Sequence, residues 1–119
     1  MSEDVIKTKS FAFAIRVVNL YKILISRNEY VMSKQILRSG TSVGANIREA
    51  KNAESKADFI HKMGISQKEA DETLYWLELL QATNYISNEE FLSLNNDGVE
   101  VLKLIKSIII SSKNNIKKT

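Results

Sequence analysis

The sequence predicts an all-α fold, an antiparallel up-down-up-down four-helix bundle that forms a single domain over residues 1–119. The length of 119 residues is close to the usual size of one domain. The chain has no proline and only four glycines, so few of the residues that favour tight turns are present. Four segments carry apolar residues spaced three and four apart, with short connections between them. Consecutive helices should therefore be antiparallel neighbours.

The first helix is predicted over about residues 5–27 and carries two adjacent apolar stripes. The first stripe consists of Phe11, Ala14, Val18, Tyr21 and Ile25, and the second of Phe13, Val17, Leu20 and Leu24. A face of this width is expected to touch more than one neighbouring helix.

The second helix, over about residues 29–53, has a thinner apolar stripe and an unusual centre of small residues. The stripe consists of Met32, Ile36, Val43, Ile47 and Ala50, and the small residues are Ser39, Gly40, Thr41, Ser42, Gly44 and Ala45. Glycine within a helix costs about 1 kcal/mol relative to alanine. Close approach of a neighbouring helix is the expected compensation.

Each of the last two helices begins with a capping-box pattern, in which a serine is followed three residues later by an acid. Ser55 with Asp58 opens the third helix, over about residues 56–84, and Ser87 with Glu90 opens the fourth, over about residues 88–112.

The fourth helix contains the run Asn95-Asn96-Asp97-Gly98, which by itself is typical of a turn. The apolar stripe keeps its phase across this run, which favours a weakened or kinked helix start, although a break stays open. Residues 113–119 are basic and polar, and we expect them to fray into a flexible tail.

The residue content argues against catalysis. The chain has no cysteine, which excludes disulfides, thiolate metal sites and cysteine nucleophiles and suits a reducing cytoplasm. His61 is the one histidine, with no companion at the spacing of a metal site or catalytic triad. Glu69 and Glu72 lack a Glu-x-x-His partner motif. The glycines of residues 40–44 lack the lysine of a phosphate loop. We therefore expect no enzyme activity, metal, cofactor or small-molecule substrate, while a carboxylate metal site at Glu69 and Glu72 is the weaker alternative. An acidic start at residues 1–4 and no apolar run of about 20 residues argue against export or a membrane span.

Charge is unevenly distributed along the chain, although the net charge is only +3. Residues 5–27 carry five basic residues and no acid, and residues 55–84 carry five acids and three bases. At 100° per residue, Lys9, Arg16 and Arg27 lie within about 20° of one another, on the side predicted to face away from the apolar stripes. In one copy this basic ridge could be a solvated surface, but repeated around a ring it would form a phosphate-binding surface. Arg38 and Arg48 either add to this ridge or pair with Glu69 and Glu72.

The second helix also carries a polar ladder, with residues spaced four, three, four and three apart and lying within about 80° of one another. Its members are Gln35, Ser39, Ser42, Asn46 and Glu49. They form either a solvated flank or a row buried between helices or subunits, where each polar group would need a hydrogen-bond partner. Short serine and asparagine side chains favour burial.

Residues 33–50, SKQILRSGTSVGANIREA, together with KADF at 56–59 and ETLYWLELL at 72–80, resemble the 23S rRNA intervening-sequence protein family, also called the four helix bundle protein family. The resemblance covers about residues 10–86, and the fourth helix matches only in pattern. It includes Arg38, Ile47 and every member of the polar ladder.

The resemblance implies an antiparallel four-helix protomer that assembles into a homopentameric ring and associates with RNA. A similar fold serves as the accessory protein of diversity-generating retroelements, where a basic ring contacts nucleic acid and a reverse transcriptase. We therefore expect a non-catalytic oligomer that binds RNA or a nucleoprotein, with Lys9, Arg16, Arg27, Arg38 and Arg48 as candidate contacts. The alternative is a protein-interaction scaffold that binds no nucleic acid.

Overall fold

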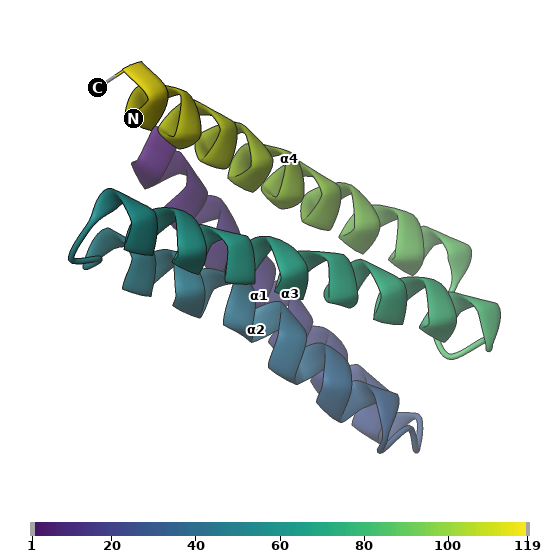
Figure 1. The fold of residues 1–119 in the computed structure, drawn as a ribbon. Helices are drawn as coiled ribbons and strands as arrows, with labels where there is room; N and C mark the ends of the chain where they lie inside the picture. Colours follow the sequence, from purple (N-terminus) through teal and green to yellow (C-terminus); the bar gives the residue numbers. More distant parts are fainter. Residues whose placement is uncertain (1, 119) are drawn as a thin grey trace.

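A computed structural model describes the backbone of residues 2–118 and the side chains of residues 5–115. Its helices are α1 (Ser2–Ser26), α2 (Met32–Lys51), α3 (Lys56–Ala82) and α4 (Asn88–Lys118), and the described residues contain no strand. Each helix runs antiparallel to the next one along the chain (Figure 1). Contacts join α1 to α2, α2 to α3, α3 to α4 and α4 back to α1. The predicted all-α four-helix fold is confirmed.

The turns after α1 and α3 are built in the same way. Asn28 and Asn84 have positive φ angles of 65° and 67°, a conformation that asparagine tolerates better than most residues. In both turns the N–H of the next residue donates a 2.9 Å hydrogen bond to a carbonyl five residues earlier. These Schellman motifs satisfy carbonyls at the helix end and reverse the chain within a few residues.

Both predicted serine caps form, and the box at Ser87 is complete. The N–H of Asp58 donates to the Ser55 hydroxyl at 3.0 Å, which caps α3. At α4 the bonds are reciprocal, because the N–H of Glu90 donates to the Ser87 hydroxyl at 3.0 Å and the N–H of Ser87 donates to the Glu90 carboxylate at 2.7 Å.

The second helix begins at Met32, three residues later than the predicted start. Glu29 lies in the connecting turn, and its buried carboxylate accepts hydrogen bonds from the N–H groups of Ser33 at 2.6 Å and Val31 at 3.3 Å. A side chain that satisfies free N–H groups at a helix start acts as its cap. Residues 29–31 therefore lie outside α2, and Glu29 caps its first turn.

The small residues of α2 allow the close helix approach predicted for them. A Cβ atom added to Gly40 would lie 2.7 and 2.8 Å from the two γ-carbons of Val17 on α1. Such distances are shorter than van der Waals contact, so only glycine permits this spacing of α1 and α2.

The fourth helix is continuous through residues 95–98, so the break that the sequence left open does not occur. Gly98 is buried, and a Cβ atom there would lie 2.7 Å from Leu74 of α3 and 3.2 Å from Phe13 of α1. The glycine therefore provides room for close packing of three helices and does not form a turn.

The predicted end of α4 at Ser112 and the predicted flexible tail are also corrected, because the helix continues to Lys118. No glycine or proline follows Gly98, so the strongest helix breakers are absent from the end of the chain. Thr119 lies outside the described residues.

Only one of the two α1 stripes is fully buried. Phe13, Val17, Leu20 and Leu24 lie in the core, whereas Ala14, Val18, Tyr21 and Ile25 are half-buried and Phe11 is exposed. The core also contains buried residues from the other three helices, including Ile36, Val43, Ile47, Met63, Leu77, Leu80, Val101 and Ile105. Part of the wide apolar face of α1 therefore has no neighbour within the protomer.

Candidate assembly and binding surfaces

The three basic residues of the predicted ridge lie along the side of the bundle where α1 packs against α4. Lys9 pairs with Glu100 at 3.0 Å, Arg16 with Asp97 at 2.6 Å and Arg27 with Glu90 at 3.0 Å. The prediction that these side chains point away from the bundle is wrong. Only the Phe13 stripe is buried, so α1 is rotated about its own axis and these side chains lie beside α4. The predicted basic ridge is therefore a row of ion pairs that joins the first and last helices.

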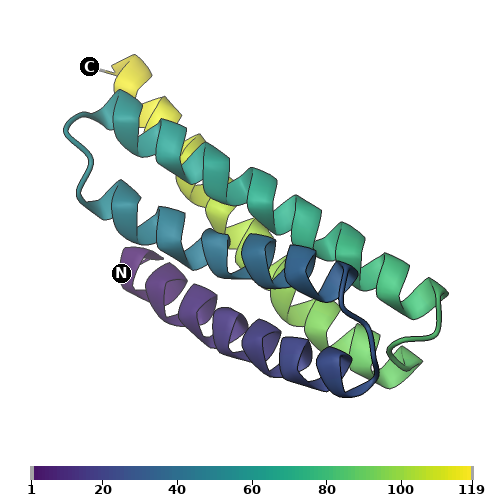
Figure 2. The same cartoon turned by 90° about the horizontal axis from the view of Figure 1, so that it is seen from below.

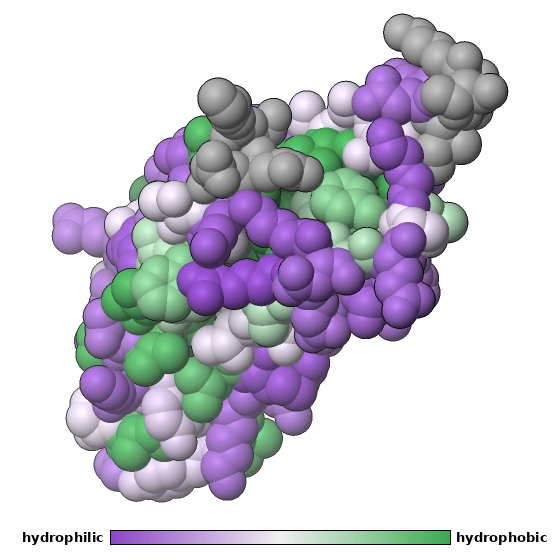
Figure 3. Space-filling model, turned by 90° about the vertical axis from the view of Figure 1, so that its left-hand side faces the viewer, coloured by the Kyte–Doolittle hydropathy of each residue, from purple (hydrophilic) through white to green (hydrophobic). Residues whose placement is uncertain are grey.

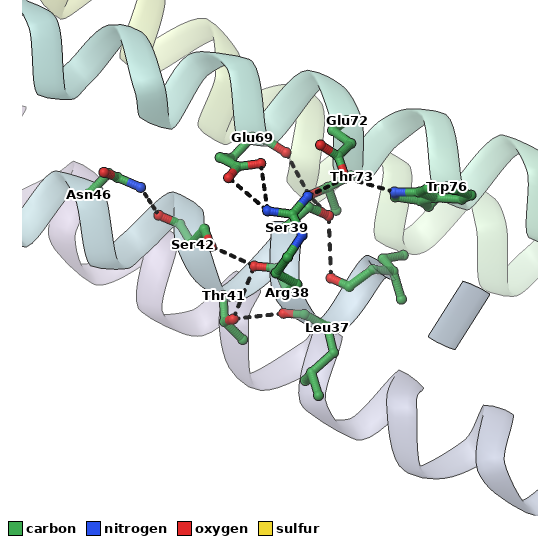
Figure 4. A network of polar contacts seen from close by, with 11 residues as sticks. Leu37, Arg38, Ser39, Thr41, Ser42, Asn46, Glu69, Glu72, Thr73 and Trp76 are labelled. Atoms are coloured by element: carbon green, nitrogen blue, oxygen red, sulfur yellow. Dashed lines mark hydrogen bonds and ion pairs between the residues drawn. The ribbon is translucent and has the colours of Figure 1, made fainter. Parts of the chain in front are cut away.

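Arg38 bridges α2 and α3, which confirms the pairing alternative for this residue (Figure 4). Its guanidinium donates to Glu69 at 2.9 Å and also to Glu72, whose carboxylate accepts a further 3.0 Å bond from the indole N–H of Trp76. These bonds raise the pKa of Arg38 above its usual value, with Glu72 contributing most. Glu69 and Glu72 thus bind an arginine.

Arg48 does not pair with either glutamate. Its guanidinium carbon lies 5.1 Å from the centre of the exposed Phe11 ring, a cation–π distance. Arg48 therefore belongs to the outer face formed by α1 and α2.

Acid should weaken the two carboxylate networks at Glu72 and Glu90. The indole N–H of Trp76 and the guanidinium of Arg38 lower the pKa of Glu72, and Arg27 and the Ser87 N–H lower that of Glu90. A lowered folded-state pKa gives stability that is present above the unfolded value of about 4.3 and is lost as pH falls through the folded value. Thermal melts in this acidic range should show a smaller pH dependence for Glu72→Gln and Glu90→Gln than for the wild type. An unchanged slope in both variants would contradict this assignment.

The polar ladder of α2 is divided between three environments. Ser39 is buried against α3, where its hydroxyl lies 2.9 Å from that of Thr73. Ser42 and Asn46 are half-buried and bond to carbonyls of their own helix, at 2.6 and 2.8 Å (Figure 4). Gln35 and Glu49 are exposed, and Glu49 pairs with Lys62 at 3.1 Å. Within one protomer, two ladder members reach α3, Ser39 in the core and Glu49 at the surface.

Two polar residues of α3, Ser66 and Thr73, also lie at the contact between α2 and α3. Neither was predicted as a site residue. The Thr73 hydroxyl lies 2.8 Å from the Glu69 carbonyl, and the buried Ser66 hydroxyl donates to the Val43 carbonyl of α2 at 2.8 Å. The available signal was spacing, because Ser66 and Thr73 alternate with buried apolar residues at intervals of three and four. Small hydroxyl residues within an apolar stripe indicate polar contacts between helices.

An apolar surface remains on the outer side of α1 and α2. Phe11 and Ile15 are 53% and 48% exposed. Beside Phe11 lies a groove of about 310 Å³, lined by Ser10, Phe11, Ala14, Thr41, Gly44, Ala45 and Arg48. Apolar patches also reach the surface among polar ones on the side of the molecule seen in Figure 3. The protomer therefore leaves apolar area uncovered where α1 lacks a neighbour.

Comparison with known proteins identifies the relatives of this chain. The family model described as 23S rRNA-intervening sequence protein matches residues 3–107. The chain belongs to this family. The 23S rRNA-intervening sequence family model covers the predicted signature at residues 33–50, which confirms the resemblance. No curated protein matches the chain.

A solved structure shows the same fold in a relative of this family member. It is the crystal structure of a protein with unknown function from the S23 ribosomal protein family of Bacteroides thetaiotaomicron. The two sequences are 61% identical, the TM-score is 0.91, and the match covers 92% of this chain and 98% of that chain.

The described part of this family member lacks two further features, a metal-binding cluster and a membrane-spanning helix. Among residues with described side chains, no group of three or more His, Cys, Asp or Glu residues is placed to hold a metal ion. None of the described helices is long and apolar enough to cross a membrane.

The ion pair between Arg16 and Asp97 should contribute little to stability. Both side chains are more than one-third exposed, and exposed pairs are worth about 0–1 kcal/mol. Arg16→Gln is therefore expected to lower the free energy of unfolding by less than about 1 kcal/mol, and by less still in high salt. Urea unfolding at two salt concentrations measures this, with Asp97→Asn as the partner variant. A larger loss that does not depend on salt would show that the contact has another role.

Proposed function

We propose that this family member is a non-catalytic homo-oligomeric binding module. The observation that carries the proposal is the exposed apolar surface of α1 around Phe11 and Ile15, next to the groove against α2. Contiguous exposed apolar surface commonly marks an interaction site. Covering it in an assembly would contribute about 25 cal/mol per Å² of apolar area removed from water.

Family resemblance adds the form of the assembly, a homopentameric ring. A cytoplasmic location fits the absence of cysteine from the sequence. In this proposal the ring of five chains is the functional unit, and it acts by presenting the same surface several times.

Light scattering coupled to size-exclusion chromatography tests the proposal. Wild-type protein should have a molar mass of at least twice the 13.5 kDa of one chain, and the double variant Phe11→Ser/Ile15→Ser should shift towards the monomer. Leu92→Ser is the matched control, because Leu92 is 53% exposed but lies on α4. A wild-type mass of one chain would exclude an assembling module.

RNA is the partner favoured by the family description, by the net charge of +3 and by the repetition of this charge in a ring. The pairing of Lys9, Arg16, Arg27 and Arg38 with carboxylates opposes it, because those contacts would compete with phosphate. A protein-directed scaffold without nucleic acid is therefore the second candidate.

Fluorescence anisotropy with a structured RNA at several salt concentrations separates the two candidates. If RNA is the partner, the logarithm of the binding constant should fall linearly with the logarithm of the salt concentration. Absence of binding even at low salt would exclude RNA and leave the scaffold, for which affinity purification should yield one protein partner and no nucleic acid.

A further inference from the structure

The outer face of α1 is apolar and positively charged. Phe11, Ile15 and Lys22 are spaced four and seven residues apart, so they share the side of the helix turned away from the core. Lys7 precedes Phe11 by one turn, and Arg48 of α2 lies against the Phe11 ring. Between residues 5 and 26, α1 contains no acidic residue. An acidic surface with an exposed aromatic residue would complement this face.

The outer face of α3 has that complementary character. Asp71, Tyr75 and Glu78 are spaced four and three apart and are all exposed, with Tyr75 at 55%. In the part of the chain with described side chains, neither Asp71 nor Glu78 forms an ion pair. The face therefore presents one tyrosine with a carboxylate about one turn to either side.

The two faces lie on opposite sides of the protomer. α1 and α3 are diagonal in the bundle and do not contact each other, and α2 runs between them in Figure 2. A surface that complements itself on one side would give a closed two-fold dimer. Two different complementary surfaces on opposite sides instead give a head-to-tail contact, which builds a ring or a filament.

We infer that the face around Phe11 on α1 of one copy docks on the face around Tyr75 on α3 of the next copy. The Tyr75 ring covers the apolar groove between α1 and α2, and Asp71 and Glu78 approach the basic residues around it. Buried aromatic residues carry much of the energy of such contacts, and complementary charge sets orientation and partner choice. This inference rests on the proposed assembly and names the two surfaces that would form it.

Charge reversal on each face tests the inference. One variant carries Lys7→Glu and Lys22→Glu, and the other carries Asp71→Lys and Glu78→Lys. Each variant alone should associate more weakly, with the dissociation constant of the assembly raised at least about tenfold in sedimentation velocity experiments. Circular dichroism should show unchanged helix content, because all four side chains are exposed. Lys103→Glu/Lys106→Glu on α4 makes the same change in net charge as the first variant and should associate normally.

Restoration of the contact is the decisive result. An equimolar mixture of the two variants should associate more strongly than either variant alone, because the reversed α1 face of one then meets the reversed α3 face of the other. A ring of five chains cannot alternate the two variants strictly, so at least one repulsive contact between like variants remains and full recovery is not expected of the mixture. A single chain with all four reversals should also assemble. The inference would be overturned if the wild type assembles and both charge-reversal variants associate normally. It would also be overturned if the variants associate weakly and neither the mixture nor the four-reversal chain restores association. Both outcomes would leave the proposed function intact. A monomeric wild type would remove the proposed function itself.

Discussion

Gly40→Ala is expected to destabilise the bundle by about 1–3 kcal/mol, the usual range for overpacking, although alanine is the better helix former. The new Cβ atom would lie 2.7 Å from a γ-carbon of Val17, which is buried and stiff at χ1. Either α1 and α2 move apart or Val17 leaves its preferred rotamer. The midpoint of urea unfolding measures the loss.

Gly64→Ala is the matched control, because Gly64 is exposed on α3 and nothing lies within 4 Å of its added Cβ atom. There the helix preference acts alone, so the variant should be more stable by up to about 1 kcal/mol. In the double variant Gly40→Ala/Val17→Ala the collision with the two γ-carbons is removed and only a 3.1 Å contact with the Cβ of residue 17 remains, so the total loss should be smaller than the sum of the single losses. Stabilisation by Gly40→Ala itself would show that the helices are not held this closely.

Thr73→Val should lower the free energy of unfolding by about 1–3 kcal/mol, because it leaves the buried Ser39 hydroxyl poorly hydrogen-bonded. Valine keeps the shape of threonine but removes the hydroxyl that contacts both Ser39 on α2 and the Glu69 carbonyl. The Ser39 hydroxyl is fully buried and would keep only a long 3.5 Å contact with the Ile36 carbonyl. Chemical denaturation is again the measurement.

The double variant Ser39→Ala/Thr73→Val isolates this contact. Removing both hydroxyls leaves neither partner of their shared bond unsatisfied, so the two losses should not add. Thr83→Val serves as the control, because Thr83 is exposed and its hydroxyl bonds only within the last turn of α3. Additive losses in the double variant would mean that the two hydroxyls do not interact.

Features set by local sequence could be predicted well. The serine caps at Ser55 and Ser87 form because each depends on residues only three apart. Gly98 lies in a local run of turn-forming residues, but α4 stays helical there and packs closely against Phe13 and Leu74. Tertiary contacts overrode local preference at that position.

Features that depend on helix rotation were harder to predict. Two neighbouring stripes on α1 were both suitable for the core, and the sequence contains no direct signal for which one is buried. The interpretation of Lys9, Arg16 and Arg27 depended on that choice. Their partners Glu100, Asp97 and Glu90 lie more than 60 residues away in sequence, so their alignment required the register between α1 and α4. Arg38 was easier, because Glu69 and Glu72 formed an evident partner pair.

Sedimentation equilibrium of the wild-type chain over a wide range of concentration tests the central claim, that this protein acts as an assembly, most directly. The proposed contacts predict one dominant species whose mass is a whole multiple of 13.5 kDa, with five chains expected from family resemblance. A mass of 13.5 kDa at every concentration would contradict the claim, because the apolar face of α1 would then stay exposed to water.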